Sequence, residues 1–270
     1  MTRRTLTLIS AAMAVAALLA LPALAGAKAT ITMSGSTSVF PLASKLASSY
    51  VKAYPGAAGF RLLQGGSDIG VNDAARGRVT FGMSSRNPQP SDPHGLVFSK
   101  IARDGVCIVT HPSNPLNNVS QATIQAVFSG RVRNWKDVPG AKAKGPIDLV
   151  TRTPTSGTAD AFQNIFMGVD LRVAGNADQK PSNGRVESAV SGDPNAIGYL
   201  DSTFTGGTAV APYQGVPCNL RNAKSGQYLG VRNLWLVSRG APTGAAKKFL
   251  NWVRGSRGQR IVATGWVPLR

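Results

Sequence analysis

Residues 30–50 read TITMSGSTSVFPLASKLASSY and carry a strand–turn–helix unit that recurs along the chain. Residues 30–33 alternate β-branched and apolar side chains, which predicts a short strand. Apolar side chains then recur at helical spacing, which predicts a helix over residues 39–54. A serine-rich turn joins the two elements, and Pro41 is tolerated because it falls in the first helical turn.

The same alternation continues through the chain. Further strands are predicted over residues 60–64, 79–83, 105–110, 147–151 and 234–238, and further helices over residues 69–77, 120–128, 158–167 and 242–254. Strands that alternate with helices are typical of a mainly parallel sheet with helices on its faces. The sequence therefore predicts an α/β fold.

Four turns rich in hydroxyl groups follow predicted strands. They span residues 34–38, 65–68, 84–86 and 155–158, and the last of them comes just after Arg152. Ligands bind at the carboxyl ends of the strands in an open parallel sheet, so we expect the four turns to converge. Serine and threonine before a helix are also ordinary N-caps, and capping is the alternative explanation of any one turn alone.

Converging turns of this kind have a definite chemistry. Helix N-termini present unpaired N–H groups and the positive end of the helix dipole, and hydroxyls donate further hydrogen bonds. Arg152 can add a bidentate, charge-assisted contact. The turns therefore predict a cage for a tetrahedral oxyanion that needs no metal and no cofactor.

The composition is strongly basic. The 270 residues include 30 Lys and Arg against 12 Asp and Glu, a net charge of +18. Such an excess suits nucleic acid, an anionic surface or a small anion, and a solvated basic surface with no ligand is the alternative. The basic residues are dispersed and aromatic residues make up only 7%, so no nucleic-acid partner is expected.

The sequence offers little support for catalysis. Ser156 could be imagined as a nucleophile, but no His follows it and no G-x-S-x-G motif is present. His94 and His111 lie in no ligand spacing with Cys107 and Cys218, so no zinc site is predicted. We expect a binding protein rather than an enzyme, and a phosphate-ester hydrolase using the same cage is the alternative from a different class.

The N-terminal segment predicts export. Arg3 and Arg4 precede an apolar run over residues 9–21 and then Ala-Leu-Ala at 23–25, the pattern of a signal peptide spanning residues 1–25. The run is shorter than the ~20 residues needed to span a bilayer. No Cys lies near the cleavage point, so no lipid anchor is predicted. In an oxidising compartment Cys107 and Cys218 form either one disulfide or two buried thiols.

The chain resembles the periplasmic phosphate-binding proteins of ABC-type phosphate importers over essentially its whole mature length. The segments that carry the resemblance are GSTSVFPLA at 35, GGSDIG at 65, FGMSSR at 81, IQAVFSGRVRNWKDV at 124, RTPTSGTADAF at 152, AIGYL at 196 and GQRIVATGWVPL at 258. The resemblance implies the type II two-lobed fold, with lobe I from residues 26–105 and 228–270, lobe II from 106–227, and two hinge strands between them.

The resemblance also implies a function. A monomeric receptor in the periplasm would capture inorganic phosphate between its lobes, for uptake through the membrane permease of an ABC transporter or for sensing. Another oxyanion such as sulfate is the alternative ligand. The contacts implied by the family fall on Thr37, Ser38, Ser67, Ser85, Arg152, Ser156, Gly157 and Thr158.

The sequence departs from the family pattern at two positions. Ser85 stands where some members carry an Asp that accepts the proton of hydrogen phosphate, and Asp68 stands where the family usually has Gly. Asp68 either supports the helix N-terminus, where a carboxylate suits the dipole, or takes over as the proton acceptor.

Overall fold

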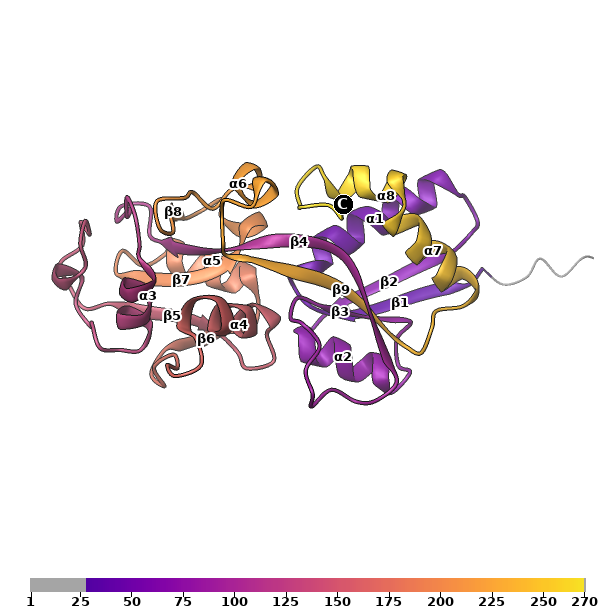
Figure 1. The fold of residues 1–270 in the computed structure, drawn as a ribbon, viewed down its shortest axis with the longest axis horizontal. Coiled ribbons are helices and arrows are strands. Elements are labelled where there is room, and N and C mark those ends of the chain that lie inside the picture. Colours follow the sequence, from indigo (N-terminus) through magenta and orange to yellow (C-terminus); the bar gives the residue numbers. More distant parts are fainter. Residues whose placement is uncertain (1–27, 270) are drawn as a thin grey trace, which may run out of the picture.

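The computed structural model describes residues 28–269, and the predicted signal peptide lies outside them. Two lobes lie side by side and are joined by the long strands β4 (Leu96–Thr110) and β9 (Val231–Arg239) (Figure 1). This two-lobed mixed α/β architecture confirms the predicted fold. One sheet runs through both lobes in the order β2-β1-β3-β9-β4-β7-β5-β6, with β8 paired to β4.

The first lobe is built from the N-terminal strand–turn–helix units. Its elements are β1 (Thr30–Gly35), α1 (Val39–Ala53), β2 (Gly59–Gln64), α2 (Ser67–Ala75) and β3 (Phe81–Ser84), with α7 (Gly244–Arg254) and α8 (Ser256–Val262) from the C-terminus. Strand β1 pairs in parallel with β2 and with β3. The apolar stripe of α1 is buried as predicted, and Leu42 and Leu46 pack with Phe81 and Phe249 in the core of this lobe.

The second lobe repeats the arrangement with more irregular connections. Its elements are α3 (Gln121–Phe128), η1 (Trp135–Asp137), β5 (Asp148–Arg152), α4 (Gly157–Phe162), η2 (Gln163–Met167), β6 (Asp178–Lys180), α5 (Asn183–Ser191), β7 (Ala196–Asp201), η3 (Ser202–Phe204), β8 (Ala209–Ala211) and α6 (Leu220–Ser225). Strand β5 pairs in parallel with β6 and β7. In its core Phe162 stacks on Tyr199, with ring centroids 3.8 Å apart.

The two crossing strands are longer than the sequence predicts. Strand β4 begins at Leu96 rather than Gly105, and β9 begins at Val231 rather than Leu234. The two strands pair antiparallel with a register shift between Lys100 and Ala102, so the sheet is parallel in its outer strands and antiparallel at its centre. Charged residues within β4 interrupt the apolar run by which a strand is usually detected in a sequence.

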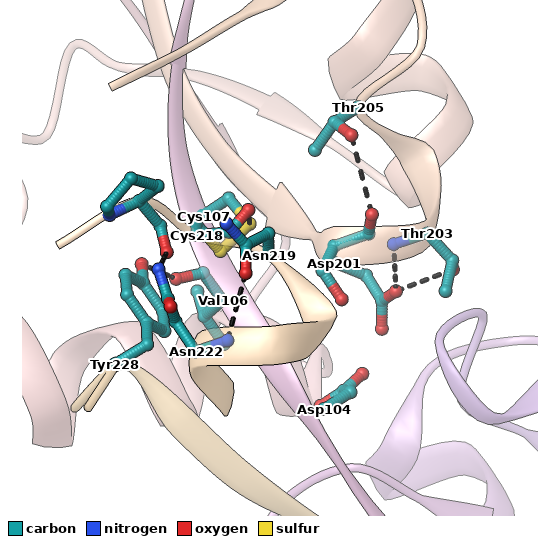
Figure 2. The surroundings of a disulfide bond; sticks show 12 residues. Asp104, Val106, Cys107, Asp201, Thr203, Thr205, Cys218, Asn219, Asn222 and Tyr228 are labelled. Carbon is teal, nitrogen blue, oxygen red and sulfur yellow. Dashed lines mark hydrogen bonds between the residues drawn. A yellow bond between two sulfur atoms is a disulfide. The ribbon is translucent and has the colours of Figure 1, made fainter. Parts of the chain in front are cut away.

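A disulfide secures β4 where it enters the second lobe. Cys107 and Cys218 are bonded, with their Cα atoms 5.7 Å apart, so of the two alternatives the disulfide is the correct one (Figure 2). Nearby, the Tyr228 hydroxyl donates to the Val106 carbonyl at 2.6 Å. The bridge closes a loop of 111 residues. A loop of that length corresponds to roughly 4–5 kcal/mol of stabilisation in the chain-entropy model.

No helix between residues 28 and 269 has both the length and the apolar character needed to cross a membrane.

Candidate anion-binding site

The turns that follow β1, β2 and β3 meet on the side of the first lobe that faces the second. The Ser36 hydroxyl donates to the Ser85 hydroxyl at 2.8 Å, and the Ser85 N–H donates to the Ser67 hydroxyl at 3.0 Å. All three side chains are buried. The predicted convergence of these turns is therefore present in the structure.

The second lobe contributes the turn between β5 and α4. The Ser156 hydroxyl caps α4 by accepting from the N–H groups of Thr158 at 3.1 Å and Ala159 at 3.3 Å. Capping, the alternative explanation of this turn, is thus also correct for Ser156. Since capping occupies only the lone pairs of the hydroxyl, its hydrogen remains for another partner.

The two half-sites touch each other directly. The hydroxyl oxygens of Ser38 and Thr158 lie 3.2 Å apart, although they come from different lobes. Gly157 lies against Ser67 and Ser85, and a Cβ at residue 157 would come within 2.7 Å of the Ser85 hydroxyl. Glycine is therefore required at this position for the lobes to approach as they do. We call these buried residues, together with Arg152, the cage: Ser36, Thr37, Ser38, Ser67, Ser85, Arg152, Ser156, Gly157 and Thr158.

Arg152 is the only charged residue of the cage. It ends β5 and is 3% exposed. Neutral oxygens accept from its guanidinium: the carbonyls of Lys180 at 3.1 Å and Pro181 at 3.0 Å, Asn183 Oδ1 at 3.0 Å, and the hydroxyls of Thr158 at 3.2 Å and Thr37 at 3.3 Å. Within residues 28–269, no carboxylate forms a salt bridge with it. Burial lowers the pKa of Arg152 to about 10. Among the described residues, the cage therefore holds a buried positive charge that no carboxylate contacts directly.

Asn183 belongs to the site but was not predicted from the sequence. Its side-chain amide donates to the hydroxyls of Thr37 at 3.1 Å and Ser38 at 2.9 Å. It begins α5, just after β6, where the sequence reads PSNG. This polar turn between a strand and a helix has the same placement as the four predicted turns and could have been found by the same rule.

Arg232 is a second buried arginine at the site, and no sequence pattern indicates it. It lies on β9 and donates to Asp104 at 2.8 Å, to Asp201 at 3.0 Å and to the Ser38 hydroxyl at 2.7 Å. The three charged residues come from β9, β4 and β7, and each is distant from the others in the sequence. Local motifs therefore could not reveal this cluster.

Asp68 lies at the rim of the cage. Its Oδ1 accepts from Arg86 Nε at 2.6 Å, and its side chain is 36% exposed. Arg86 also pairs with Asp92 at 2.6 Å. The Asp68 N–H donates to the Thr155 carbonyl of the other lobe at 3.2 Å. In this structure the Asp68 carboxylate is thus engaged by Arg86 and not by a hydroxyl of the cage.

A pocket of about 460 Å³ opens beside the cage, and its lining includes Asp68, Arg86, Arg152, Ser156, Asp160 and Tyr199. Asp160 from the second lobe accepts from the Gln89 side-chain amide of the first lobe at 2.7 Å at this pocket. Among residues 28–269, no group of three or more His, Cys, Asp or Glu side chains is placed to hold a metal ion.

Fold and site together define a two-lobed binding protein whose buried cationic cage lies between its lobes. The chain belongs to the PBP superfamily, because residues 22–257 match the family model described as a PBP superfamily domain. This confirms the family resemblance stated from the sequence.

Individual proteins similar to this chain are consistent with this family. The phosphate-binding protein PstS of Bacillus subtilis (strain 168) is 26% identical over 250 residues, which cover 90% of this chain and 82% of that protein. The crystal structure of a putative phosphate ABC transporter substrate-binding protein from Clostridium perfringens, with bound phosphate, superimposes with a TM-score of 0.84 at 29% identity, covering 89% of this chain and 100% of that one. An ABC-type phosphate transport receptor from Vibrio cholerae, 24% identical with a TM-score of 0.72 over 88% of this chain and 100% of that chain, shares the fold.

Proposed function

We propose that this protein is a receptor that captures inorganic phosphate between its two lobes and delivers it to an ABC importer. One observation carries the proposal: Arg152 is buried without a carboxylate, and serine and threonine hydroxyls from both lobes surround it. A tetrahedral anion would supply the missing negative charge and accept from these hydroxyls. The names of the relatives from Bacillus subtilis and Clostridium perfringens support the same ligand.

The cage has enough donors for useful affinity. A hydrogen bond to a charged group contributes about 1.5–3 kcal/mol net. Micromolar binding requires about 8 kcal/mol, so a handful of such bonds is sufficient even after the cost of ordering. Ligand contacts are proposed for Thr37, Ser38, Ser67, Ser85, Arg152, Ser156, Gly157 and Thr158. Asp68 lies at the rim, where its carboxylate accepts from Arg86 instead.

The same proposal includes the export of the protein, the movement of its lobes and its transporter partner. Residues 1–25 would direct export and be removed, which would leave a monomer in the periplasm without a lipid anchor. Residues 26–105 with 228–270 would move against residues 106–227 about the two crossing strands, and a membrane permease would receive the ligand. No nucleic acid and no cofactor takes part, and the protein acts as a receptor and not as an enzyme.

Calorimetric titration of the refolded, ligand-stripped protein with phosphate tests the proposal. We expect one site per chain with micromolar or tighter affinity. The matched control is Arg185→Ala, which removes an exposed arginine of α5 outside the cage and should bind as wild type does. Failure to bind phosphate at millimolar concentration would contradict the proposal. Robust turnover of a phosphomonoester by the pure protein, with metals added, would favour the hydrolase instead.

A further inference from the structure

The hydrogen-bond directions within the cage carry information about the ligand. A hydroxyl has one hydrogen to donate and two lone pairs that accept, whereas an N–H group can only donate. A hydroxyl that already accepts from two N–H groups must therefore give its own hydrogen to a further partner. Counting these bonds shows which cage hydroxyls have a fixed direction.

Ser38 is fixed as a donor. Its oxygen accepts from Arg232 Nη2 at 2.7 Å and from Asn183 Nδ2 at 2.9 Å. The orientation of the Asn183 amide is itself determined, because its Oδ1 accepts from the Asp201 N–H at 3.2 Å and from Arg152 Nη1 at 3.0 Å. Both lone pairs of Ser38 are occupied, so its hydrogen is left for the cage.

Ser156 and Ser36 are fixed in the same way. Ser156 accepts from the N–H groups of Thr158 and Ala159 at the start of α4. Ser36 accepts from the N–H groups of Ser38 at 3.2 Å and Val39 at 3.3 Å, and it donates to Ser85. Ser156 therefore donates its hydrogen toward the cage. The hydrogen of Ser36 goes to Ser85, so one lone pair of the Ser85 oxygen is always occupied.

Ser67 and Ser85 keep a choice of direction. The Ser85 oxygen accepts one fixed bond, from Ser36, and the Ser67 oxygen accepts one, from the Ser85 N–H. Their two oxygens lie 3.3 Å apart, and either can be the donor. While they share this bond, the two hydroxyls together retain one hydrogen and one lone pair, so the pair can either donate to an anion oxygen or accept from a protonated one.

No carboxylate oxygen completes the cage. Among residues 28–269, the nearby carboxylates have other partners: Asp68 pairs with Arg86, Asp104 and Asp201 pair with Arg232, and Asp160 accepts from Gln89 and Asn164. An ionised carboxylate can only accept, so it would require a proton on the ligand and repel an oxygen that lacks one. A hydroxyl imposes no such requirement.

We propose that the cage also binds fully deprotonated tetrahedral oxyanions, represented by sulfate, and that Ser85 determines this breadth. The inference rests on the proposed function, since it concerns the same site. It names a wider ligand class: doubly charged tetrahedral oxyanions with or without a proton.

Parallel calorimetric titrations with phosphate and sulfate at about pH 8 test the inference, since an introduced carboxylate is ionised there. In the wild-type cage sulfate would leave no polar group without a partner, and such a site discriminates only weakly between two ligands. For wild type we therefore expect the dissociation constants of phosphate and sulfate to differ by less than about 100-fold. In Ser85→Asp the carboxylate would face an unprotonated sulfate oxygen, and sulfate affinity should fall relative to phosphate by a further ~100-fold or more.

Ser48→Asp is the matched control, because it adds the same charge on the exposed face of α1 outside the cage. It should leave the ratio of the two dissociation constants unchanged. Tight phosphate binding with a sulfate affinity more than about 100-fold weaker in wild type would overturn the inference and leave the proposed function intact. If neither anion binds, the proposed function itself fails. The wild-type ratio decides the matter even if Ser85→Asp does not fold.

Discussion

Two buried arginines at the site, Arg152 and Arg232, differ in how their charge is balanced. Arg152 is 3% exposed and donates only to carbonyl, amide and hydroxyl oxygens. Arg232 is 6% exposed and donates to the carboxylates of Asp104 and Asp201. Within the described part of the chain, one guanidinium therefore has no carboxyl group in contact with it and the other has two. The difference distinguishes a side chain available to an anionic ligand from one that holds strands together.

The pKa values follow this difference. Burial lowers the pKa of Arg152 well below its ordinary value, to about 10, which corresponds to roughly 3 kcal/mol by which the folded protein disfavours the charged form. Burial also acts against the charge of Arg232, but Asp104 and Asp201 outweigh it and raise its pKa. Because the folded pKa of Arg152 is the lower one, the unliganded protein bears this cost at neutral pH. A bound anion would offset it.

The largest expected effect is on stability, at Arg232. Arg232→Met leaves two buried acidic groups without their cation, and the free energy of unfolding should fall by about 3–5 kcal/mol. Urea denaturation of the ligand-free protein measures this loss. Arg239→Met, at the exposed end of the same strand, is the control and should change little. A loss below about 1 kcal/mol would mean that the ion cluster does not support the crossing strands.

The next effect is on binding, at Arg152. Arg152→Ala should weaken phosphate binding by about 2–5 kcal/mol, because the charge-assisted bonds are lost. Unlike Arg232→Met, it should leave the fold intact, since it leaves no charge unpaired. Calorimetry gives the affinity and a thermal melt without phosphate gives the stability. A binding loss much smaller than this would place the ligand elsewhere.

The sequence allowed the strand–turn–helix units to be predicted because their signals are local. The stripe of α1 and the turn before it lie within one segment, and the helix was predicted within one residue of its observed end at Ala53. The crossing strands were underestimated because Lys100, Arg103 and Asp104 break their apolar pattern. Their pairing depends on a partner more than a hundred residues away, which periodicity cannot reveal.

The same reason explains which parts of the site were missed. The hydroxyl turns could be found because each has its own place between a strand and a helix. The contacts that connect them are not local: Arg232 and Ser38 are 194 residues apart, and Asn183 and Ser38 are 145 apart. Sequence alone predicted the donors but not the two side chains that orient them.

Asn183→Asp would give Arg152 a carboxylate partner, as Arg232 already has. The new carboxylate would pair with Arg152 and repel an anionic ligand, so phosphate affinity should fall by about 1.5–3 kcal/mol. Stability without ligand should hold or rise. Asn183→Ala removes the amide without adding charge and should have the smaller effect in calorimetry. Equal losses in the two variants would show that orientation, and not charge, explains the role of Asn183.

The smallest effect is expected at Asp104, and its dependence on pH is the informative part. Burial raises the pKa of Asp104 well above its ordinary value and outweighs the attraction of Arg232. Burial would also raise the pKa of Asp201, but a hydrogen bond with Asp104 and the charge of Arg232 lower it. The pKa of Asp104 is therefore raised and that of Asp201 is lowered, so of the two carboxyls Asp201 keeps its charge to the lower pH beside Arg232.

Asp104→Asn copies the protonated acid and should change the free energy of unfolding by only about 1 kcal/mol. Since the folded pKa of Asp104 is raised, its contribution is complete below the ordinary pKa of 3.8 and is lost as the pH rises through the folded value. The stability advantage of wild type over Asp104→Asn should therefore shrink as the pH rises above 3.8 in urea titrations. Asp201→Asn is the matched variant, and the contribution of Asp201 should be lost only as the pH falls below 3.8. An advantage over Asp104→Asn that grows with pH would mean that Asp104 is ionised and that Arg232 is balanced by two negative charges.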